Sequence, residues 1–192
     1  MQHHSSVKVW DPFVRVFHWT LVGAFAVAFV TEDDFLTLHT WAGYLVGALV
    51  LLRVLWGFTG TRYARFSSFV FSPKVVLGYL KDTLQFRAKR YLGHNPAGGA
   101  MIVVLLASLV VTTVTGLVVL GAAENAGPLA GWLGGTSEVW SDIFEEVHEI
   151  IAYLTLLLVA IHVGGVIVES VLHRENLVRA MIDGTKRAAP GQ

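Results

Sequence analysis

The stretch EEVHEIIAYLTLLLVAIHVGGVIVES, residues 145–170, is apolar enough to cross a membrane, yet it carries two histidines, His148 and His162. A membrane-spanning helix needs about 20 mainly apolar residues, and this stretch supplies them. Ionisable side chains inside a span are costly, and they usually face the interior of a helix bundle and serve a function. The two histidines are therefore the first candidates for functional residues.

The spacing of these two histidines places them on one face of a helix. They are 14 residues apart, which at about 100° per residue is within about 40° of four full turns. A rise of about 1.5 Å per residue separates them by roughly 21 Å along the helix axis. One lies near each end of the span, so the sequence predicts two separate sites, one in each half of a membrane.

Three further segments have the length and composition of membrane spans. Of the 192 residues, 54% are hydrophobic and only 15% are charged, a balance typical of membrane proteins. Asp11 is a predicted N-cap of the first span, because Pro12 follows it and proline is tolerated at the first helical position. The four predicted spans cover about residues 12–30, 38–58, 98–120 and 147–169.

The segment between the second and third spans has a different pattern. Over residues 74–90, apolar side chains such as Val75, Tyr79 and Leu84 alternate with basic ones, which predicts an amphipathic helix lying in the membrane interface. We therefore predict an all-α membrane protein: a four-transmembrane-helix bundle with an interfacial amphipathic helix between spans two and three. The predicted bundle is a single domain over residues 7–187.

Charged residues are distributed unevenly along the chain. All 14 Lys and Arg residues lie near the start of the first span, at the end of the second, in the loop that follows it, or beyond the fourth. The loops between spans one and two and between spans three and four contain acidic residues and neither Lys nor Arg. Because Lys and Arg in short loops stay on the cytoplasmic side, both termini are expected in the cytoplasm and the acidic loops outside.

Two further histidines match the first two in depth. His18 lies six residues into the first span and His162 seven residues before the end of the fourth, so both lie toward the cytoplasmic side. His39 opens the second span and His148 the fourth, so both lie toward the outside. Neutral imidazole is a common axial ligand of haem iron, and helix bundles hold cofactors between facing helices. The count and the depths fit two bis-histidine haems.

Other metal sites fit the sequence less well. The chain has no cysteine, which excludes a covalently attached c-type haem and any thiolate-bound iron–sulfur or zinc site. Glu145 and His148 have the spacing of a di-iron carboxylate motif, but no second copy exists. His148 and Glu149 begin an H-E-x-x-H zinc motif, but its fifth position is Ala152. For each histidine taken alone, hydrogen bonding to backbone or lipid headgroups remains the alternative.

Arginines and glycines near the histidines fit the same interpretation. Arg53, near the end of the second span, and Arg15, three residues before His18, are candidate partners of haem propionates, because guanidinium–carboxylate pairs are strong and bidentate. The alternative is that both side chains extend to the lipid headgroups. Small residues either let a flat ring approach the backbone or let helices pack closely. The glycines concerned are Gly23, Gly43, Gly47, Gly116, Gly164 and Gly165.

Five stretches together resemble the bacterial cytochrome b-561 family, which includes the membrane cytochrome b subunits of nickel–iron hydrogenases. They cover nearly the whole chain, from Val7 to Arg187. They are VWDPFVRVFHW (9–19), HTWAGYLVGALVLLRVLWGF (39–58), GHNPAGGAMIVVLL (93–106), the opening stretch (145–170) and RENLVRAMIDGTKR (174–187).

The resemblance implies a four-helix bundle of the bacterial inner membrane that binds two non-covalent b haems. Carried onto this chain, it assigns His18 and His162 to the cytoplasmic haem and His39 and His148 to the outer one, the same pairing as the depths. Members of the family pass electrons between the quinone pool and an outer-face partner, which is a hydrogenase or a c-type cytochrome. The alternatives are a haem-binding membrane sensor or assembly factor, and a redox-inactive membrane anchor of a partner complex.

The quinone site is expected on the cytoplasmic side, because quinone reduction takes protons from water as well as electrons. The candidate residues there are Arg53, His94 and Asn95. A rival site beside the outer haem would use the aromatic surfaces of Trp41, Trp132 and Trp140, which also suit interface anchors. Expected partners are the lipid membrane, quinone or quinol, and a periplasmic or membrane-attached redox protein. A homodimer is a further candidate, and no nucleic-acid partner is expected.

Overall fold

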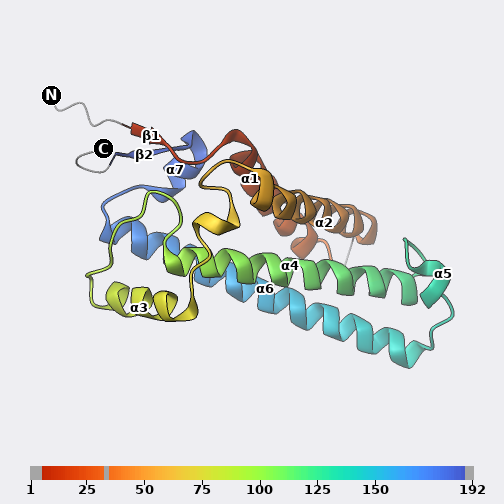
Figure 1. Ribbon diagram of the computed structural model, residues 1–192. Coiled ribbons are helices and arrows are strands. Elements are labelled where there is room, and N and C mark those ends of the chain that lie inside the picture. The colour runs from red at the N-terminus through yellow and green to blue at the C-terminus, as the bar shows by residue number, and fades with distance from the viewer. Residues whose placement is uncertain (1–5, 33–34, 189–192) are drawn as a thin grey trace. The chain divides into compact units, whose positions relative to one another are not determined.

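The structure, a computed structural model, describes residues 6–32 and 35–188 and is mostly helical there (Figure 1). Asp33 and Asp34, two acidic residues of the loop between the first two spans, lie outside the described residues. The elements in chain order are β1 (Ser6–Lys8), α1 (Pro12–Val30), α2 (Leu36–Thr59), the 3-10 helix η1 (Phe66–Ser68), α3 (Pro73–Leu84), α4 (Pro96–Ala122), α5 (Ala130–Leu133), α6 (Glu138–Leu172), α7 (Leu177–Asp183) and β2 (Thr185–Arg187).

Four of these helices, α1, α2, α4 and α6, are long and apolar enough to cross a membrane. Most of their side chains are not buried by the protein, and large apolar ones such as Leu51 (61% exposed) and Leu157 (56%) face outward. An exposed apolar surface of this extent is typical of contact with lipid. The chain is therefore a multi-pass helical membrane protein.

The ends of the long helices follow the sequence pattern with one exception. The first three agree with the predicted spans to within two residues at each end. Helix α6 begins at Glu138, nine residues before the predicted start of the fourth span at 147. These extra residues include Asp142 and Glu145, which hydropathy excludes from a span, although acidic side chains stabilise the N-terminal turns of a helix. The helix is thus longer than its apolar part.

Asp11 is the N-cap of α1, as the sequence predicts. Its Oδ1 accepts a hydrogen bond from the Val14 amide at 2.9 Å. Its Oδ2 accepts from Trp56 Nε1 at 3.1 Å and from Thr61 Oγ1 at 2.6 Å. Burial raises the pKa of the Asp11 carboxyl, but these hydrogen bonds outweigh burial and the pKa is lowered. One carboxylate thus joins the start of α1 to the end of α2.

The residue contacts divide the chain into two compact units. Unit 1 comprises residues 1–20, 51–104 and 160–192, and unit 2 comprises residues 21–50 and 105–159, so each long helix contributes to both. All 14 Lys and Arg residues belong to unit 1, whereas unit 2 holds nine of the 14 acidic residues. The single domain over residues 7–187 remains a prediction.

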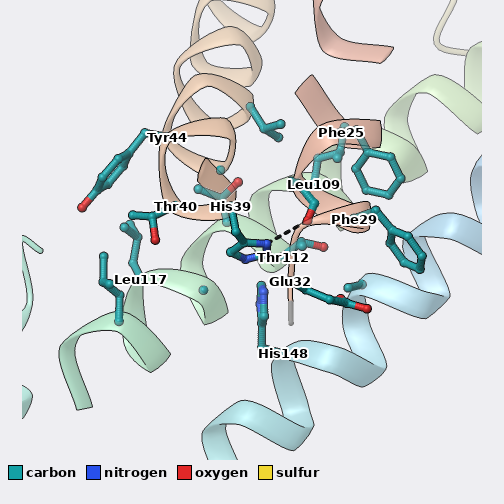
Figure 2. Close-up of a pocket in the computed structure, with 17 residues that line it drawn as sticks. Phe25, Phe29, Glu32, His39, Thr40, Tyr44, Leu109, Thr112, Leu117 and His148 are labelled. Carbon is teal, nitrogen blue, oxygen red and sulfur yellow. Dashed lines mark hydrogen bonds between the residues drawn. The ribbon is translucent and has the colours of Figure 1, made fainter. Parts of the chain in front are cut away.

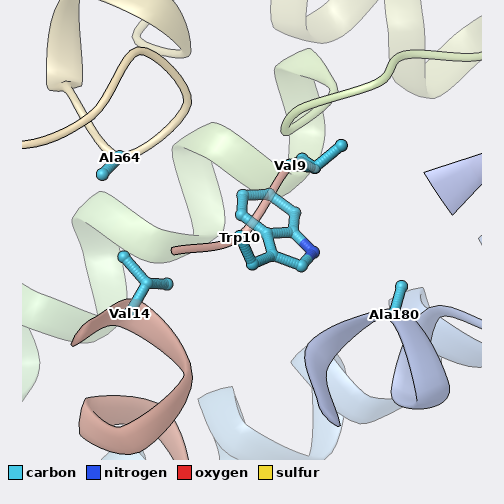
Figure 3. Close-up of a cluster of buried hydrophobic side chains, with 5 residues drawn as sticks. All are labelled: Val9, Trp10, Val14, Ala64 and Ala180. Carbon is cyan, nitrogen blue, oxygen red and sulfur yellow. The ribbon is translucent and has the colours of Figure 1, made fainter. Parts of the chain in front are cut away.

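Unit 1 has a small core built from the two ends of the chain. Its buried side chains are Val9, Trp10, Val14, Ala64 and Ala180 (Figure 3). Strands β1 and β2 pair antiparallel, with Val7 opposite Lys186. The amides of Val9 and Trp10 both donate to the Gly184 carbonyl, at 2.9 and 3.1 Å. The N-terminal and C-terminal segments are therefore held together.

Helix α3 is shorter than the predicted amphipathic helix. It ends at Leu84, and Phe86 has a φ of 57°, in the left-handed region that ends a helix. Tyr79 is buried, whereas Leu77 and Leu80 are exposed, so one face packs on the protein and another carries apolar side chains outward. A position in the membrane interface remains a prediction.

In unit 2, helices α4 and α6 lie side by side (Figure 1) and share hydroxyl groups. Thr155 of α6 is fully buried, and its Oγ1 lies 2.6 Å from Ser108 Oγ and 2.9 Å from Thr112 Oγ1, both on α4. Polar contacts of this kind hold helices together where lipid offers no hydrophobic driving force. They fix α4 beside the part of α6 that carries His148.

Candidate functional site

Unit 2 contains a pocket in which His39 and His148 face each other (Figure 2). His39 comes from α2 and His148 from α6, and their ring centroids are 6.1 Å apart with the ring planes at 89°. The rest of the lining is mainly apolar and includes Phe25, Phe29, Leu109, Leu117 and Gly43. The structure thus brings together the two histidines that the sequence places near the outer side.

A backbone carbonyl of α1 determines which ring nitrogen of His39 carries the proton. Its Nδ1 lies 2.8 Å from the Ala28 carbonyl oxygen, drawn as a dashed line in Figure 2. A carbonyl oxygen only accepts, so Nδ1 carries the proton and donates it. In a neutral imidazole the other nitrogen, Nε2, then keeps its lone pair.

Thr115 of α4 does the same for His148. Its Oγ1 lies 3.0 Å from the carbonyl oxygens of Val111 and Thr112, and a hydroxyl has one proton to donate, so it donates toward these carbonyls. The same Oγ1 lies 2.9 Å from His148 Nδ1 and therefore accepts the proton on that nitrogen. Nε2 of His148 is again left with a free lone pair.

Glycines give the two rings room. A Cβ added to Gly116 would lie 3.0 Å from His148 Cε1, so the bare backbone lets this ring pack closely against α4. A Cβ added to Gly43, one turn after His39 on the same helix, would meet nothing within 4 Å. Gly43 lines the pocket, and the open space beside it suits a flat ring. Gly47 instead packs against Thr113, as helix-contact glycines do.

The residues of this pocket fit a haem held between two imidazoles. The ring centroids of His39 and His148 are 6.1 Å apart, and each imidazole makes its hydrogen bond through Nδ1, so Nε2 of each is left to bind a metal. Histidines that bind metal almost always donate their other N–H to a carbonyl or similar group, as both do here. In the described part of the chain no three His, Asp or Glu side chains gather to hold a metal ion.

The second pair, His18 of α1 and His162 of α6, belongs to unit 1. The two side chains are close enough to interact electrostatically. Nδ1 of His18 is buried and has no hydrogen-bond partner among the described residues. A buried nitrogen without a partner suits a haem ligand, although here no backbone or hydroxyl group sets the tautomer of His18. The ligand roles of all four histidines remain predictions.

Arg53 is a buried cation with an unused donor. It is 3% exposed, its Nη2 donates to the Ala64 carbonyl at 3.1 Å, and its guanidinium lies 5.5 Å from the Phe66 ring centre and 5.9 Å from that of Phe69. Its Nη1 is buried with no partner among the described residues. This burial does not match a side chain that extends to the headgroups, whereas a propionate would satisfy the unused donor.

Arg15 already has a partner in the structure. Its Nη1 donates to the Ile182 carbonyl at 2.7 Å, which ties α1 to the end of α7. Its Nε is buried and unpaired among the described residues. A propionate contact for Arg15 remains a prediction, and the observed role is to hold the C-terminal segment.

His94 and Asn95 lie inside unit 1 rather than in an open loop. The His94 ring packs against Trp10 and Phe69, with centroids 4.4 and 4.8 Å away. Burial, helped by the nearby charges of Arg53 and Lys186, lowers the pKa of His94 to about 3. Asn95 accepts the Gly98 amide on its Oδ1 at 2.6 Å and so caps α4.

A group of ionisable residues escaped the sequence analysis. Tyr79 of α3 lies 3.0 and 3.1 Å from the two carboxylate oxygens of Glu169 on α6. Glu169 Oε2 lies 3.2 Å from His173 Nε2. His173 reads as an exposed polar residue in the sequence, but that is wrong, because its side chain is only 14% exposed. Glu169 lies seven residues after His162 and hence on the same helical face, which is a usable sequence signal. No such signal links Tyr79 to it.

Comparisons with known proteins point to one family. A family model described as prokaryotic cytochrome b561 matches residues 9–184. A "Probable Ni/Fe-hydrogenase B-type cytochrome subunit" of Rhodobacter capsulatus is 25% identical, over 96% of this chain and 82% of that protein. Proteins with the same name from Rhizobium leguminosarum bv. viciae and Cupriavidus necator are 26% and 27% identical, over 95% and 94% of this chain and 89% and 86% of theirs. No solved structure gives a significant match.

Proposed function

Because this chain belongs to the prokaryotic cytochrome b561 family, we propose that it is a di-haem b-type cytochrome that carries electrons across the bacterial inner membrane. Membership of this family makes it a membrane cytochrome that transfers electrons through b-type haem. The proposal adds two haems per chain, quinone as the membrane-soluble reactant, and a redox partner at the outer face.

The pocket of His39 and His148 carries this proposal. Bound haem would supply one-electron chemistry, its iron alternating between the ferrous and ferric states. His39 and His148 would hold it through Nε2, because Ala28 and Thr115 keep each Nδ1 protonated. The apolar lining would keep water away from the ring and so help to set its potential.

The second haem would lie between His18 and His162. The two side chains interact electrostatically in unit 1, and Arg53 has a buried donor there without a partner. We assign a propionate to Arg53 as its anion, with Arg15 as a second candidate. The quinone site would be formed by His94, Asn95 and Arg53. Arg53 is close enough to His94 to influence it electrostatically, and Asn95 follows His94 directly in the sequence.

Both chain ends are proposed to lie in the cytoplasm. The pairing of β1 with β2 keeps the two ends together, which requires an even number of crossings. The four apolar helices satisfy that requirement. All Lys and Arg residues belong to unit 1, and the bias of such residues toward the cytoplasm places the chain ends on that side.

The outer-face partner is proposed to be a nickel–iron hydrogenase, because the relatives named above are hydrogenase cytochrome subunits. A c-type cytochrome is the second candidate, since both proteins exchange single electrons. Reduction of the haems by hydrogen in the presence of the hydrogenase, or by a reduced c-type cytochrome in its absence, would identify the partner.

Haem content after single histidine substitutions tests the proposal. The purified protein should contain two non-covalent haems per chain by pyridine haemochrome assay, and acid–acetone should extract all of them, because the chain has no cysteine. His39→Ala and His148→Ala should remove the same spectral component, and His18→Ala and His162→Ala the other one. His173→Ala is the matched control and should retain both haems.

Three outcomes would contradict the proposal. One haem per chain would exclude the second site. Loss of the same component from His18→Ala and His39→Ala would overturn the pairing. Two haems that a quinol fails to reduce would leave haem binding intact but reject quinone as the reactant, in favour of a sensor or assembly role.

A further inference from the structure

Quinone reduction consumes two electrons and two protons, so the quinone site proposed above needs a proton route from water. The electrons would arrive one at a time from the haem beside it, and the protons from the cytoplasm. Resting on that proposed function, we propose that His173, Glu169 and Tyr79 form the route by which protons reach the quinone at Asn95. His173 receives the proton, Glu169 passes it on, and Tyr79 delivers it.

The three side chains follow one another in a row at short distances, with an ion-pair contact between His173 and Glu169 and a hydrogen bond between Glu169 and Tyr79. His173 Nε2 lies 3.2 Å from Glu169 Oε2, and that oxygen lies 3.0 Å from the Tyr79 hydroxyl. The side chains of His173 and Glu169 are each 14% exposed, whereas Tyr79 is 6% exposed as a whole residue. Nε2 of His173 is itself buried, so the exposed atoms belong to other parts of the His173 and Glu169 side chains, and Tyr79 is the more buried end of the row.

The buried end of the row meets the quinone site at Asn95. Asn95 lies close enough to Tyr79 for its side chain to lower the pKa of the tyrosine hydroxyl. Asn95 Oδ1 already accepts from the Gly98 amide, which leaves its NH₂ group as the donor available to a neighbouring oxygen. The hydroxyl proton of Tyr79 has two acceptors within reach, the Glu169 carboxylate at 3.0 Å and the Lys89 carbonyl at 3.2 Å, and Glu169 is the nearer. The Tyr79 hydroxyl thus has the Glu169 carboxylate on one side and Asn95, a residue of the proposed quinone site, on the other.

The surroundings keep Tyr79 a proton donor. Burial, and then the charge of Glu169, raise the pKa of Tyr79 well above its usual range, so the hydroxyl stays protonated at physiological pH. The Tyr79 oxygen can give its proton to a quinone oxygen while it takes another from a protonated Glu169. Glu169 then regains a proton from water through His173. Each transfer moves one proton, so two passages accompany the two electrons that turn quinone into quinol.

Other charges around Glu169 do not interrupt the row. Lys186 of β2 is buried and interacts electrostatically with Glu169, but it lies over the Trp10 ring at 5.7 Å and 3.5 Å from the Tyr91 carbonyl. Arg90 is engaged by Glu175 at 2.7 Å. Glu175, with a side chain 7% exposed, thus has a direct cationic partner and belongs to a separate ion pair.

The alternative role for the Tyr79–Glu169 contact is structural, holding α3 on α6. Glu169→Gln keeps the size and an oxygen acceptor for the tyrosine, but it cannot carry a proton. Tyr79→Phe keeps the ring and removes the hydroxyl. Glu175→Gln is the matched control, because it neutralises a similarly buried carboxylate outside the row.

The test uses the haem-loaded, prereduced protein mixed rapidly with decylubiquinone or with ferricyanide. Ferricyanide takes an electron without a proton, so its rate reports electron transfer alone. Glu169→Gln and Tyr79→Phe should slow reoxidation by decylubiquinone by about 10-fold to 100-fold, in line with the loss of a positioned proton donor. In both variants the rate of reoxidation by ferricyanide should stay within about 2-fold of wild type. Their haem spectra should be unchanged. Glu175→Gln should be reoxidised by decylubiquinone at a rate within about 2-fold of wild type.

A binding measurement separates an effect on proton delivery from an effect on quinone binding. Decylubiquinone should quench tryptophan fluorescence with the same affinity in wild type, Glu169→Gln and Tyr79→Phe, because Asn95 and the Trp10–His94 contact are unchanged. Wild-type rates with decylubiquinone from both variants would overturn the proton route and leave the proposed function standing. Equal slowing with ferricyanide would show a structural role instead. Failure of the wild-type protein to reduce decylubiquinone would reject the proposed function itself.

Discussion

Thr115 is the residue that decides which nitrogen of His148 is free. Its hydroxyl proton goes to a helix carbonyl, so its oxygen is left to accept from Nδ1. The neighbouring Thr113 offers a comparison on the same helix, because its Oγ1 is buried with no hydrogen-bond partner among the described residues. Thr113 and Thr115 therefore lie two residues apart on α4, and only the hydroxyl of Thr115 contacts a histidine.

Thr115→Val should loosen the haem proposed to bind at His39 and His148. Valine keeps the shape but removes the acceptor, so Nδ1 loses its partner and the ring loses its preset tautomer. Haem transfer to a scavenging apoprotein should become about 10-fold faster, and the midpoint potential of this haem should shift. Thr113→Val is the control and should change neither quantity. Equal behaviour of the two variants would remove Thr115 from the site.

At the scale of elements, the Asp11 carboxylate joins two long helices. It caps α1 through Val14 and accepts from Trp56 and Thr61 at the end of α2. Its pKa is lower in the folded protein than the ordinary value of 3.8. A lowered pKa stabilises the fold above that ordinary value, and the contribution is lost as the pH falls through the folded value.

Asp11→Ala should therefore destabilise the protein at neutral pH by about 1–2 kcal/mol, the usual range for losing an N-cap. Below pH 3.8 the difference from wild type should shrink, because the unfolded wild-type chain then binds a proton that the folded carboxylate binds only at a still lower pH. Thermal unfolding in detergent, followed by circular dichroism between pH 3 and 7, measures the difference in stability between Asp11→Ala and wild type. Asp82→Ala is the control, since Asp82 is 51% exposed and its contact with Arg87 is 3.9 Å long. A pH-independent difference would contradict the linkage.

Across the whole molecule, basic and acidic residues are distributed unevenly between the two units defined by the residue contacts. Unit 2 has no Lys or Arg, and the start of α6 exposes Glu138, Asp142, Glu145 and Glu146. This acidity accompanies the cytoplasmic bias of basic residues, and it also suits a basic redox partner on the outer side. The two explanations differ in what salt should do to the reaction rate.

A basic partner should reduce the protein at a rate that falls steeply with ionic strength. Mixing the haem-loaded protein with a positively charged c-type cytochrome between about 10 and 150 mM salt measures it, because screening lengths fall from about 30 to 8 Å over that range. The double variant Glu138→Gln, Asp142→Asn should lower both the rate and its dependence on salt. Asp82→Asn, in unit 1, is the control. A rate independent of salt would leave topology as the sole reason for the acidity.

Local periodicity explains what the sequence predicts well. Apolar runs define spans to within two residues for three helices, and helical spacing places His148 and His162 on one face. The beginning of α6 was missed because hydropathy ignores the helix dipole that favours its acidic first turns. The Ala28 carbonyl at His39 was invisible because backbone groups carry no sequence identity. Tyr79 and Glu169, 90 residues apart, meet only through tertiary packing.

The pairing of β1 with β2 has a consequence for synthesis. Ser6 pairs with Arg187, so at about 5–20 residues per second the first strand emerges roughly ten to thirty-five seconds before its partner. During that interval Val9 and Trp10 lack the Gly184 carbonyl that their amides later bind. A nascent chain halted before that glycine would leave an indole and an open strand edge exposed. Chaperones and proteases could thus distinguish a stalled polypeptide from a finished one.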